Sequence, residues 1–393
     1  MRPLQSLRWY MECYHLLPLF ILSCLSFNTW EGKHYISRLV VIMLVVTLFA
    51  ARGVIIYNFF RPEILKATRF WLGIAFIMSC YHFLRGETFS TPRTIIVSLI
   101  YMLVVPWHNI SRKSVLLIIL LGGCVAGVSG LYERAILNIA RVGSVINEIP
   151  FALYVAITLL IAIHTLNFFQ SRSMKLAAWL AILGSTFAVI TSEVRGVWLA
   201  FGCVALFSVL GQLKKLTVGK ATLMVVITLV GLLFLSSIEV VENRIIQTKN
   251  EFVEIANGNQ NTSIGIRFQL WRSAIDIIES HPFMGVGTEG YKNAMESQYQ
   301  QGLLTSTALS FKNAHFHNQY LDSYVRYGVI GLVLVIIIFL SPGFLYRGRL
   351  NISISILLLS SGLTDVPLMH TGIIYMVVLY PAVIIFSGNE NVY

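Results

Sequence analysis

The sequence predicts an all-α, polytopic membrane protein of about 12 transmembrane helices, with one large, partly helical loop on the outer side. Its 393 residues are 56% hydrophobic and only 12% charged, whereas soluble domains carry roughly 25% charged residues. The apolar residues also fall into runs long enough to cross the roughly 30 Å of hydrocarbon in a bilayer. These observations exclude a soluble globular domain.

Apolar runs of about 15 to 22 residues mark the expected spans. The first follows the basic stretch MRPLQSLRW, and because no small-residue cleavage site comes after it, we expect a retained span and not a signal peptide. Nine spans are expected in residues 1–238 and three in residues 319–393, near 15–30, 39–59, 70–84, 93–107, 114–131, 150–169, 176–193, 196–212, 220–238, 321–341, 351–366 and 369–387.

An even number of spans places both termini on one side of the membrane. The short loops expected on that side are rich in lysine and arginine, which the positive-inside rule assigns to the cytoplasm. These residues are Arg61, Lys66, Arg69, Arg112, Lys113, Arg172, Lys175, Lys214, Lys215, Lys220, Arg347 and Arg349. The formal net charge of +11 is thus mainly an orientation signal, and it requires no nucleic-acid partner.

Residues 239–318 form the one long connection, about 80 residues on the outer side. Connections of this length with their own structure are usually functional. All five cysteines lie in or beside the expected spans, so neither a disulfide nor a cysteine-rich zinc site is available to this loop. We therefore expect the loop to fold by packing on the membrane bundle.

A helix is expected within this loop, in the segment NTSIGIRFQLWRSAIDIIESHPFMGVGTEGYKNA. Thr262 or Ser263 is a suitable N-cap. Pro282 and the following GVG end the helix, and a second helix should start near Thr288. Apolar residues at helical spacing form a stripe that we expect to face the bundle or the bilayer surface: Ile264, Phe268, Trp271, Ile275 and Ile278.

Two arginines lie where membrane orientation does not require them. Arg267 is on the edge of the apolar stripe, where it either acts at the membrane interface or snorkels beside Trp271. Arg195, in AVITSEVRGVWLAF, is at an outer turn with Glu193 two residues away. It is either a salt-bridged structural residue or an anion ligand.

The segment HFHNQYLDSYVRYGVIGL leads from the polar loop into an apolar span. His317 is either a hydrogen-bonded interfacial residue or a catalytic group. His315 and His317 alternate on a loop without a third ligand nearby, which makes a poor zinc site. The sequence assigns no role to His315.

Three of these segments together resemble the bacterial O-antigen ligases. The residues that carry the resemblance are His317 and Asn318 followed by Gly328 and Gly331, SIGIRFQLW and HPFMGVG with Ser263, Arg267 and Trp271, and SEVRGVWLA with Arg195. Their order and shared membrane side extend the resemblance over almost the whole chain. Such enzymes transfer a surface polysaccharide from undecaprenyl diphosphate to the core sugars of lipid A. The resemblance implies a GT-C-like glycosyltransferase in the bacterial inner membrane, with cytoplasmic termini and a periplasmic active site.

The implied reaction requires a base for the acceptor hydroxyl and positive charge for the departing diphosphate. We expect His317 to be the general base, with Asn318 or Asp322 orienting its ring. We expect Arg195 and Arg267 to bind the diphosphate, because a guanidinium stays charged and can contact two phosphate oxygens at once.

No metal or other cofactor is expected. The chain has only three aspartates, Asp276, Asp322 and Asp365, without the Asp-x-Asp pair that would suit a metal-held diphosphate. Ser263 and Trp271 are expected to support the site. Gly328 and Gly331 are expected to be structural, because they remove side chains from one face of the tenth span and so allow close helix packing beneath the site.

Two other interpretations compete with a ligase. An O-antigen polymerase would use a second carrier-linked glycan as acceptor, and polymerases tend to show two large outer loops. A lipid-linked sugar transporter would often show internal repeats and broken spans in matching positions, and the two halves of this sequence show no repeat. The ligase is favoured, with undecaprenyl-diphosphate-linked O-antigen, the lipid A core oligosaccharide and membrane lipids as partners.

Overall fold

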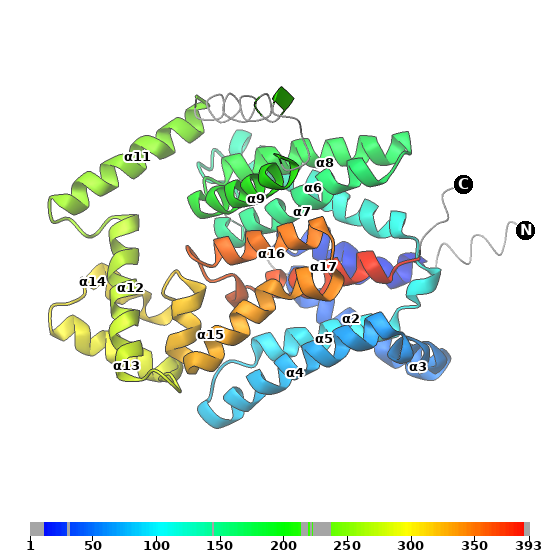
Figure 1. Cartoon of the computed structure of the whole chain (residues 1–393), viewed down its shortest axis with the longest axis horizontal. Coiled ribbons are helices and arrows are strands. Elements are labelled where there is room, and N and C mark those ends of the chain that lie inside the picture. Colours follow the sequence, from blue (N-terminus) through cyan, green and yellow to red (C-terminus); the bar gives the residue numbers. More distant parts are fainter. Residues whose placement is uncertain are drawn as a thin grey trace, which may run out of the picture. The chain divides into compact units, whose positions relative to one another are not determined.

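The computed structural model describes residues 12–29, 32–143, 145–213, 219–220, 222 and 237–388. Within these residues the regular elements are helices and no β-strand occurs, which confirms the predicted all-α class (Figure 1). The chain divides into two compact units. The first runs to Ser192 and includes Ser341–Ile354 and the residues from Leu368 onwards, and the second comprises Glu193–Leu340 and Ser355–Pro367.

The first unit is a bundle of apolar helices. A Cβ added at Gly127 of α6 would meet the backbone of Gly184 of α8, so these two helices approach closely at small residues. Such approaches are typical of helix packing inside membranes, where no hydrophobic force draws helices together. The elements are Glu12–Leu25 with its π-helical end η1 (Ile21–Leu25), α2 (Gly32–Ala50), α3 (Arg52–Phe60), α4 (Pro62–Arg85), α5 (Ser90–Val104), η2 (Trp107–Asn109), α6 (Arg112–Ala135), α7 (Glu148–Phe168), α8 (Arg172–Thr191) and α17 (Thr371–Phe386).

The second unit contains the large loop. It begins with α9 (Arg195–Leu213) and ends with parts of α15 (Gln319–Tyr346) and α16 (Arg349–Ser361) and the start of η4 (Pro367–Met369). Figure 1 shows the loop helices α12, α13 and α14 gathered beside one another. The loop elements are α11 (Glu239–Ala256), α12 (Ser263–Ser280), α13 (Gly287–Gln300), α14 (Ser306–Leu309) and the 3₁₀ turn η3 (Ser310–Asn313).

Six of the described helices are long and apolar enough to cross a membrane, namely α4, α6, α7, α8, α9 and α15. The pair α2 and α3 counts as a seventh span, but it is bent by 103°, so the expected span at 39–59 is not one straight helix. Four shorter apolar helices, Glu12–Leu25, α5, α16 and α17, coincide with further expected spans. The span expected near 220–238 lies largely outside the described residues, and the count of 12 stays a prediction.

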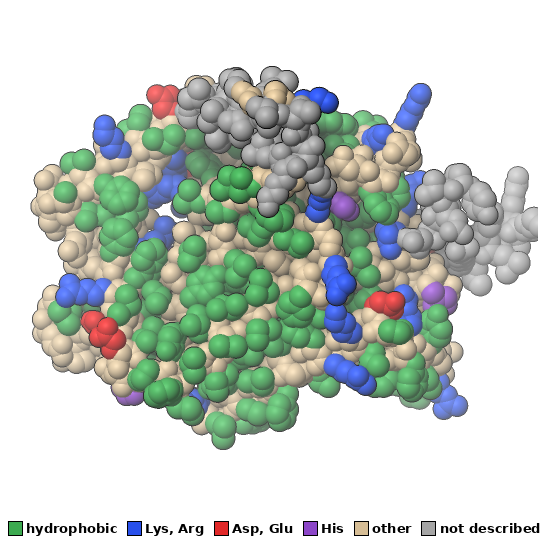
Figure 2. Space-filling view, viewed as in Figure 1, with side chains coloured by type: hydrophobic (Ala, Val, Ile, Leu, Met, Phe, Trp, Pro, Cys, Tyr) green, Lys and Arg blue, Asp and Glu red, His purple; other side chains and the backbone are tan. Residues whose placement is uncertain are grey.

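The outward faces of these helices are apolar. On α4, Phe76, Phe83 and Leu84 are 68%, 79% and 82% exposed. Figure 2 shows apolar side chains over much of the face that it draws. Large exposed apolar surfaces mark membrane or partner contacts, so lipid is the environment that suits these helices. The chain is a polytopic membrane protein.

The large loop has a small hydrophobic core of its own. The sequence predicts that the loop folds by packing on the membrane bundle, and the structure adds a core that is formed largely by the loop itself and that α15 joins through Val325. The predicted stripe on α12 also differs from the buried face, since Phe268 and Ile275 are 44% and 46% exposed while Leu270 and Ala274 are fully buried. The core consists of Leu270, Ala274, Ile277, Tyr291, Met295, Leu304, Ala308 and Phe316, joined by Val325 of α15.

The helix boundaries in the loop follow the local sequence signals. Thr262 caps α12, because its side-chain oxygen accepts the Gly265 N–H at 3.1 Å. The turn that follows α12 has positive φ at Gly285 and Gly287, of 61° and 73°. Helix α13 begins at Gly287, one residue before the predicted start.

Gly328 interrupts α15. Its φ of 68° and ψ of −158° lie in a region that is open almost only to glycine. A Cβ at Gly328 would overlap the carbonyl oxygen of Phe283, and a Cβ at Gly331 would overlap that of Ser323. These glycines permit a break in α15 and the close approach of the turn before α13. The reason predicted from the sequence, close packing against another helix, is not the one that the structure shows.

We expect Gly328→Ala to lower the free energy of unfolding by roughly 2–4 kcal/mol, because it combines an unfavourable backbone conformation with a steric overlap. Gly202→Ala in α9 is the matched control, since nothing lies within 4 Å of a Cβ there and alanine favours a helix. Thermal unfolding in detergent measures both variants. Equal melting temperatures for the two variants would contradict this role of Gly328.

Candidate active site

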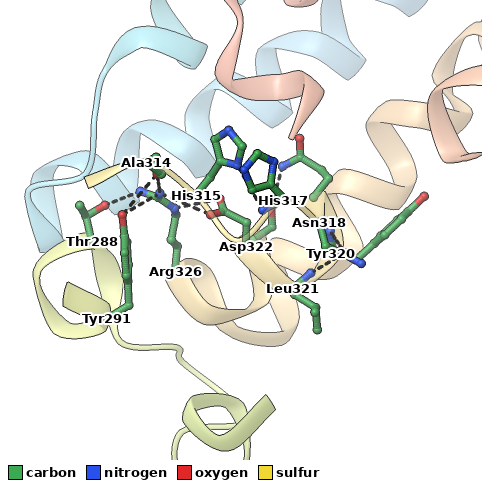
Figure 3. Close-up of polar contacts among 12 residues, drawn as sticks. Thr288, Tyr291, Ala314, His315, His317, Asn318, Tyr320, Leu321, Asp322 and Arg326 are labelled. Carbon is green, nitrogen blue, oxygen red and sulfur yellow. Dashed lines mark hydrogen bonds and ion pairs between the residues drawn. The ribbon is translucent and has the colours of Figure 1, made fainter. Parts of the chain in front are cut away.

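The segment from Ala314 to Asn318 lies between η3 and the start of α15 (Figure 3). Phe316 is 1% exposed, and its ring packs on Tyr291 in the loop core with a centroid distance of 5.3 Å. His317 has a φ of 50°, a left-handed conformation that is uncommon outside glycine. The segment brings the rings of His315 and His317 side by side, with centroids 4.4 Å apart (Figure 3).

A buried carboxylate orients the His317 ring. His317 Nδ1 lies 3.3 Å from Asp365 Oδ1, and Asp365 is only 4% exposed. An ionised carboxylate accepts the Nδ1–H, which assigns the proton of the neutral imidazole to Nδ1 and leaves the lone pair on Nε2. His317 is therefore arranged to take up a proton at Nε2.

Asp365 was not among the residues predicted from the sequence to orient this ring, which were Asn318 and Asp322. It is 48 residues away along the chain and lies in the turn after α16. The signal for it is the single acidic residue in SGLTDVPLMH, near the end of the span expected at 351–366. Ionisable groups at such positions are costly to bury and are often functional.

Asn318 caps α15 and ties it to the turn that carries Asp365. Its Oδ1 accepts the N–H groups of Tyr320 and Leu321 at 3.0 and 3.1 Å. Its Nδ2 donates to the carbonyl oxygen of Leu363 at 3.2 Å. The contacts of Asn318 thus hold the start of α15 against the turn after α16.

Asp322, the other acid predicted to orient the ring, is bonded to Arg326 one turn later in α15. Arg326 Nε lies 2.9 Å from Asp322 Oδ2, and its Nη2 lies 3.4 Å from Asp322 Oδ1. The carboxylate beside His317 is that of Asp365. Arg326 also donates to three further groups, Thr288 Oγ1, Tyr291 Oη and the Ala314 carbonyl oxygen (Figure 3).

Arg326 thus clamps α13 and the histidine segment to α15. It is 7% exposed, and its guanidinium lies over the Tyr291 ring at 4.8 Å from the centroid. Burial raises the pKa of Tyr291, and the guanidinium opposes that rise, so the phenol is neutral near pH 7. Arg326 was not predicted from the sequence, although an Asp and an Arg four residues apart in an apolar helix are a signal for an ion pair.

His315, His317 and Asp365 form a cluster with the potential to hold a metal ion, the one such group within the described part of the chain. Their ligand atoms all lie within 4.8 Å of one another. The expectation that the two histidines have no third ligand nearby is therefore wrong, because Asp365 comes from a distant segment. Two imidazoles and one carboxylate would suit Zn²⁺ better than Mg²⁺, which prefers oxygen ligands.

Arg195 begins α9 and is ion-paired to the loop. Its Nη2 lies 2.9 Å from Glu251 Oε1, and its Nη1 donates to Thr248 Oγ1 at 2.8 Å, both on α11. The salt bridge considered from the sequence is thus present, although the nearby Glu193 does not make it. Glu193 pairs instead with Arg244, also on α11, at 2.9 Å.

Glu251 connects Arg195 to the helix that carries Arg267. It is 7% exposed, and its Oε2 accepts the Ile264 N–H at 3.0 Å in the first turn of α12. Arg267 follows one turn later and is half-buried. The same carboxylate therefore contacts Arg195 and the start of the Arg267 helix.

The start of α9 also contacts the turn that carries Asp365. A Cβ added at Gly196 would overlap the Thr364 hydroxyl, so the Thr364 side chain packs directly against the backbone of Gly196. The Arg195 segment thus lies against α11, which is hydrogen-bonded to α12. It also lies against the turn that carries Asp365, the residue that contacts His317. Ser263 and Trp271 both lie on α12, the first exposed and the second half-buried.

The family match to known proteins covers the segments of Arg195, Arg267 and His317 but does not reach Asp365. Residues 176–336 match the family model described as O-antigen ligase. An uncharacterized protein of Haemophilus influenzae is 29% identical over 251 residues, which cover 62% of this chain and 62% of that protein. An O-antigen ligase of Escherichia coli is 22% identical over 181 residues, which cover 45% of this chain and 42% of that protein. The matches span less than two thirds of the length of either relative.

We expect Arg326→Met to lower the free energy of unfolding by roughly 3–5 kcal/mol, because it leaves the buried Asp322 carboxylate without its partner. Arg272→Met on α12 is the control, since Arg272 is exposed. The double variant Asp322→Asn, Arg326→Met should recover part of the loss, as expected for coupled residues. Thermal unfolding and limited proteolysis of the loop measure the effect. Equal stability of Arg326→Met and Arg272→Met would show that the clamp does not hold the loop.

Proposed function

We propose that this chain belongs to the O-antigen ligase superfamily, as its family match and its Escherichia coli relative support, and that it transfers O-antigen from undecaprenyl diphosphate to the core sugars of lipid A at the periplasmic face of the inner membrane. The observation that carries the proposal is the 3.3 Å contact between His317 Nδ1 and the buried Asp365 carboxylate. It leaves Nε2 as a base in the segment that resembles the ligase motif. The arginine segments of the same resemblance lie in the same unit.

His317 acts as the general base in this reaction. A hydroxyl of the acceptor sugar attacks the anomeric carbon of the donor, the bond from that carbon to the phosphate oxygen breaks, and undecaprenyl diphosphate leaves. The hydroxyl proton passes to Nε2 of His317. Asp365 then stabilises the imidazolium that forms, as a carboxylate does in other histidine-based sites.

Arg195 and Arg267 bind the diphosphate of the donor. Negative charge on the diphosphate grows as the glycosidic bond breaks, and fixed guanidinium groups stabilise it. Glu251 balances the charge of Arg195 before the donor arrives. A diphosphate carries more negative charge than one carboxylate and offers paired oxygens to a guanidinium, so it can replace Glu251 at Arg195.

The reaction proceeds without a metal ion. A divalent ion on a diphosphate is usually held by clustered carboxylates, whereas the cluster at His317 contains the single carboxylate of Asp365. The two arginines supply the positive charge in place of a metal. An O-antigen polymerase would use the same chemistry, and only its acceptor would differ, so the acceptor decides between the two functions. The name of the Escherichia coli relative, O-antigen ligase, supports the ligase.

The direct test combines the purified protein with undecaprenyl-diphosphate-linked O-antigen in detergent, in excess EDTA and without ATP. One arm offers lipopolysaccharide that lacks O-antigen, and the other offers only more carrier-linked glycan. We expect a ladder of modified lipopolysaccharide in the first arm. Longer carrier-linked chains in the second arm would identify a polymerase. Activity that requires added Mg²⁺ or Mn²⁺ would contradict the metal-free reaction.

We expect His317→Ala to reduce transfer by roughly 100- to 10,000-fold, because it removes the proton acceptor. Asp365→Asn should cause a loss of similar order, because an amide does not fix the Nδ1–H tautomer or balance the imidazolium. His281→Ala, at an exposed histidine of the same loop, is the control and should transfer normally. The initial rate of ladder formation measures all three. Near-normal transfer by His317→Ala would remove the base from the proposal.

We expect Arg195→Lys and Arg267→Lys to remain as defective as the alanine variants, because an ammonium is a point charge and does not form the paired contacts of a guanidinium. The loss should be of the order of about 3 kcal/mol in the barrier, as for a single oxyanion donor. Donor binding and transfer rate are measured together. If Arg267 only snorkels, lysine should substitute well.

An exchanged pair separates a ligand role of Arg195 from a structural role. Arg195→Glu combined with Glu251→Arg keeps an ion pair between α9 and α11 but loses the acceptor of the Ile264 N–H. It should therefore recover part of the melting temperature that the single variants lose, but not their transfer. Restored transfer in the exchanged pair would assign Arg195 to structure alone.

A further inference from the structure

His315 has no part in the reaction described above, yet its ring is packed into the same cluster. Its Nδ1 accepts the backbone N–H of His317 at 3.1 Å. Its Nε2 lies 3.9 Å from Asp365 Oδ1. The side chains of His315, His317 and Asp365 are only 16%, 15% and 6% exposed. His315 therefore touches both the backbone and the carboxylate that determine the position of the base.

The backbone hydrogen bond fixes the tautomer of His315. A ring nitrogen that accepts a hydrogen bond carries no proton, so the proton of neutral His315 is on Nε2. This is the atom that faces Asp365. The 3.9 Å contact is too long for a hydrogen bond, but it directs an N–H toward the carboxylate. Asp365 Oδ1 thus faces the N–H groups of both rings.

The same hydrogen bond supports the strained backbone of His317. A non-glycine residue at a φ of 50° persists only where its surroundings hold it. On one side, Phe316 is anchored in the loop core, and on the other side Asn318 caps α15. His315 restrains the backbone of His317 directly, because its Nδ1 accepts the hydrogen bond from the His317 N–H.

We propose that His315 is a positioning residue that holds the left-handed turn of His317 and keeps its Nε2 available to the acceptor hydroxyl. This inference rests on the proposed function, in which His317 is the base. His315, His317 and Asp365 then form one proton-handling unit, with His315 as its neutral member.

The hydrogen bond also argues against a metal ion as the purpose of this cluster. A metal on Nε2 of His315 would require the ring proton to move to Nδ1. Two N–H groups, that of Nδ1 and that of the His317 backbone, would then point at each other, and the hydrogen bond would be lost. A metal on Nδ1 would displace that N–H directly. Ligating histidines usually donate their second ring nitrogen to a neighbour, whereas Nδ1 of His315 accepts.

Three substitutions separate the hydrogen bond from the ring. His315→Asn keeps an acceptor near the position of Nδ1, while His315→Gln places its amide near the position of Nε2, and His315→Ala removes both. We expect the Asn variant to transfer at close to the wild-type rate. We expect the Gln and Ala variants to lose roughly 10- to 100-fold in kcat, with unchanged KM for donor and acceptor. His281→Asn, at an exposed histidine, is the matched control.

A second measurement needs no substrate and therefore does not depend on the proposed function. Nitrogen NMR of histidine-labelled protein in detergent reports the tautomer of each ring, and the signals of His317 are those missing in His317→Gln. We expect Nδ1–H and bare Nε2 at His317 in the wild type and in His315→Asn. In His315→Ala the proton should distribute over both nitrogens, while the melting temperature shows whether the fold is retained.

Two results would overturn the inference. The first is a His315→Ala variant with the wild-type rate and the wild-type tautomer of His317. The second is a wild-type rate that a chelator abolishes and zinc restores, since that would make the cluster a metal site. If the tautomer changes as expected in protein that transfers no glycan to any acceptor, His315 still positions His317 and only the proposed function fails.

Discussion

The contact between Asp365 and His317 is the constraint on which the arrangement of this site depends. A buried carboxylate is costly unless it is paired and hydrogen-bonded, and Asp365 is almost fully buried. Its partner lies 48 residues earlier in the chain, so the turn after α16 must lie against the start of α15. The cap formed by Asn318 follows from this arrangement, because its amide reaches the carbonyl oxygen of Leu363. Two short polar segments are thus held together at the ends of apolar helices.

The large loop brings its own packing to this junction. Phe316 belongs to the core of the loop and stands between the two histidines in sequence, so the position of the imidazoles depends on how α12, α13 and α14 pack. Arg326 transmits this packing into α15 through its bonds to Asp322 and α13. Gly328 lets the turn before α13 approach the broken helix. A loop that only lay on the bundle would not determine the histidine geometry in this way.

The sequence predicted those features that depend on neighbours along the chain. The apolar runs, the cap at Thr262 and the start of α13 are of this kind, because capping and helical periodicity are local. The candidate base His317 was found by resemblance. Asp365 and Glu251 were not foreseen as partners, since each lies on a segment that only the fold brings close. For the same reason Gly328 was recognised as structural while its contact with the loop turn was not.

The arginines of this unit differ in a way that bears on their roles. Arg326 is surrounded on all sides, with its donors directed at Asp322, Thr288, Tyr291 and the Ala314 carbonyl, and its side chain is 9% exposed. The side chain of Arg195 is 19% exposed, and its ion-pair partner Glu251 belongs to a separate helix of the loop. A guanidinium enclosed by fixed donor contacts suits a structural clamp. One that is partly open and paired to a carboxylate on a separate helix suits an exchange between that carboxylate and an incoming diphosphate, because the exchange keeps the charge of the guanidinium balanced.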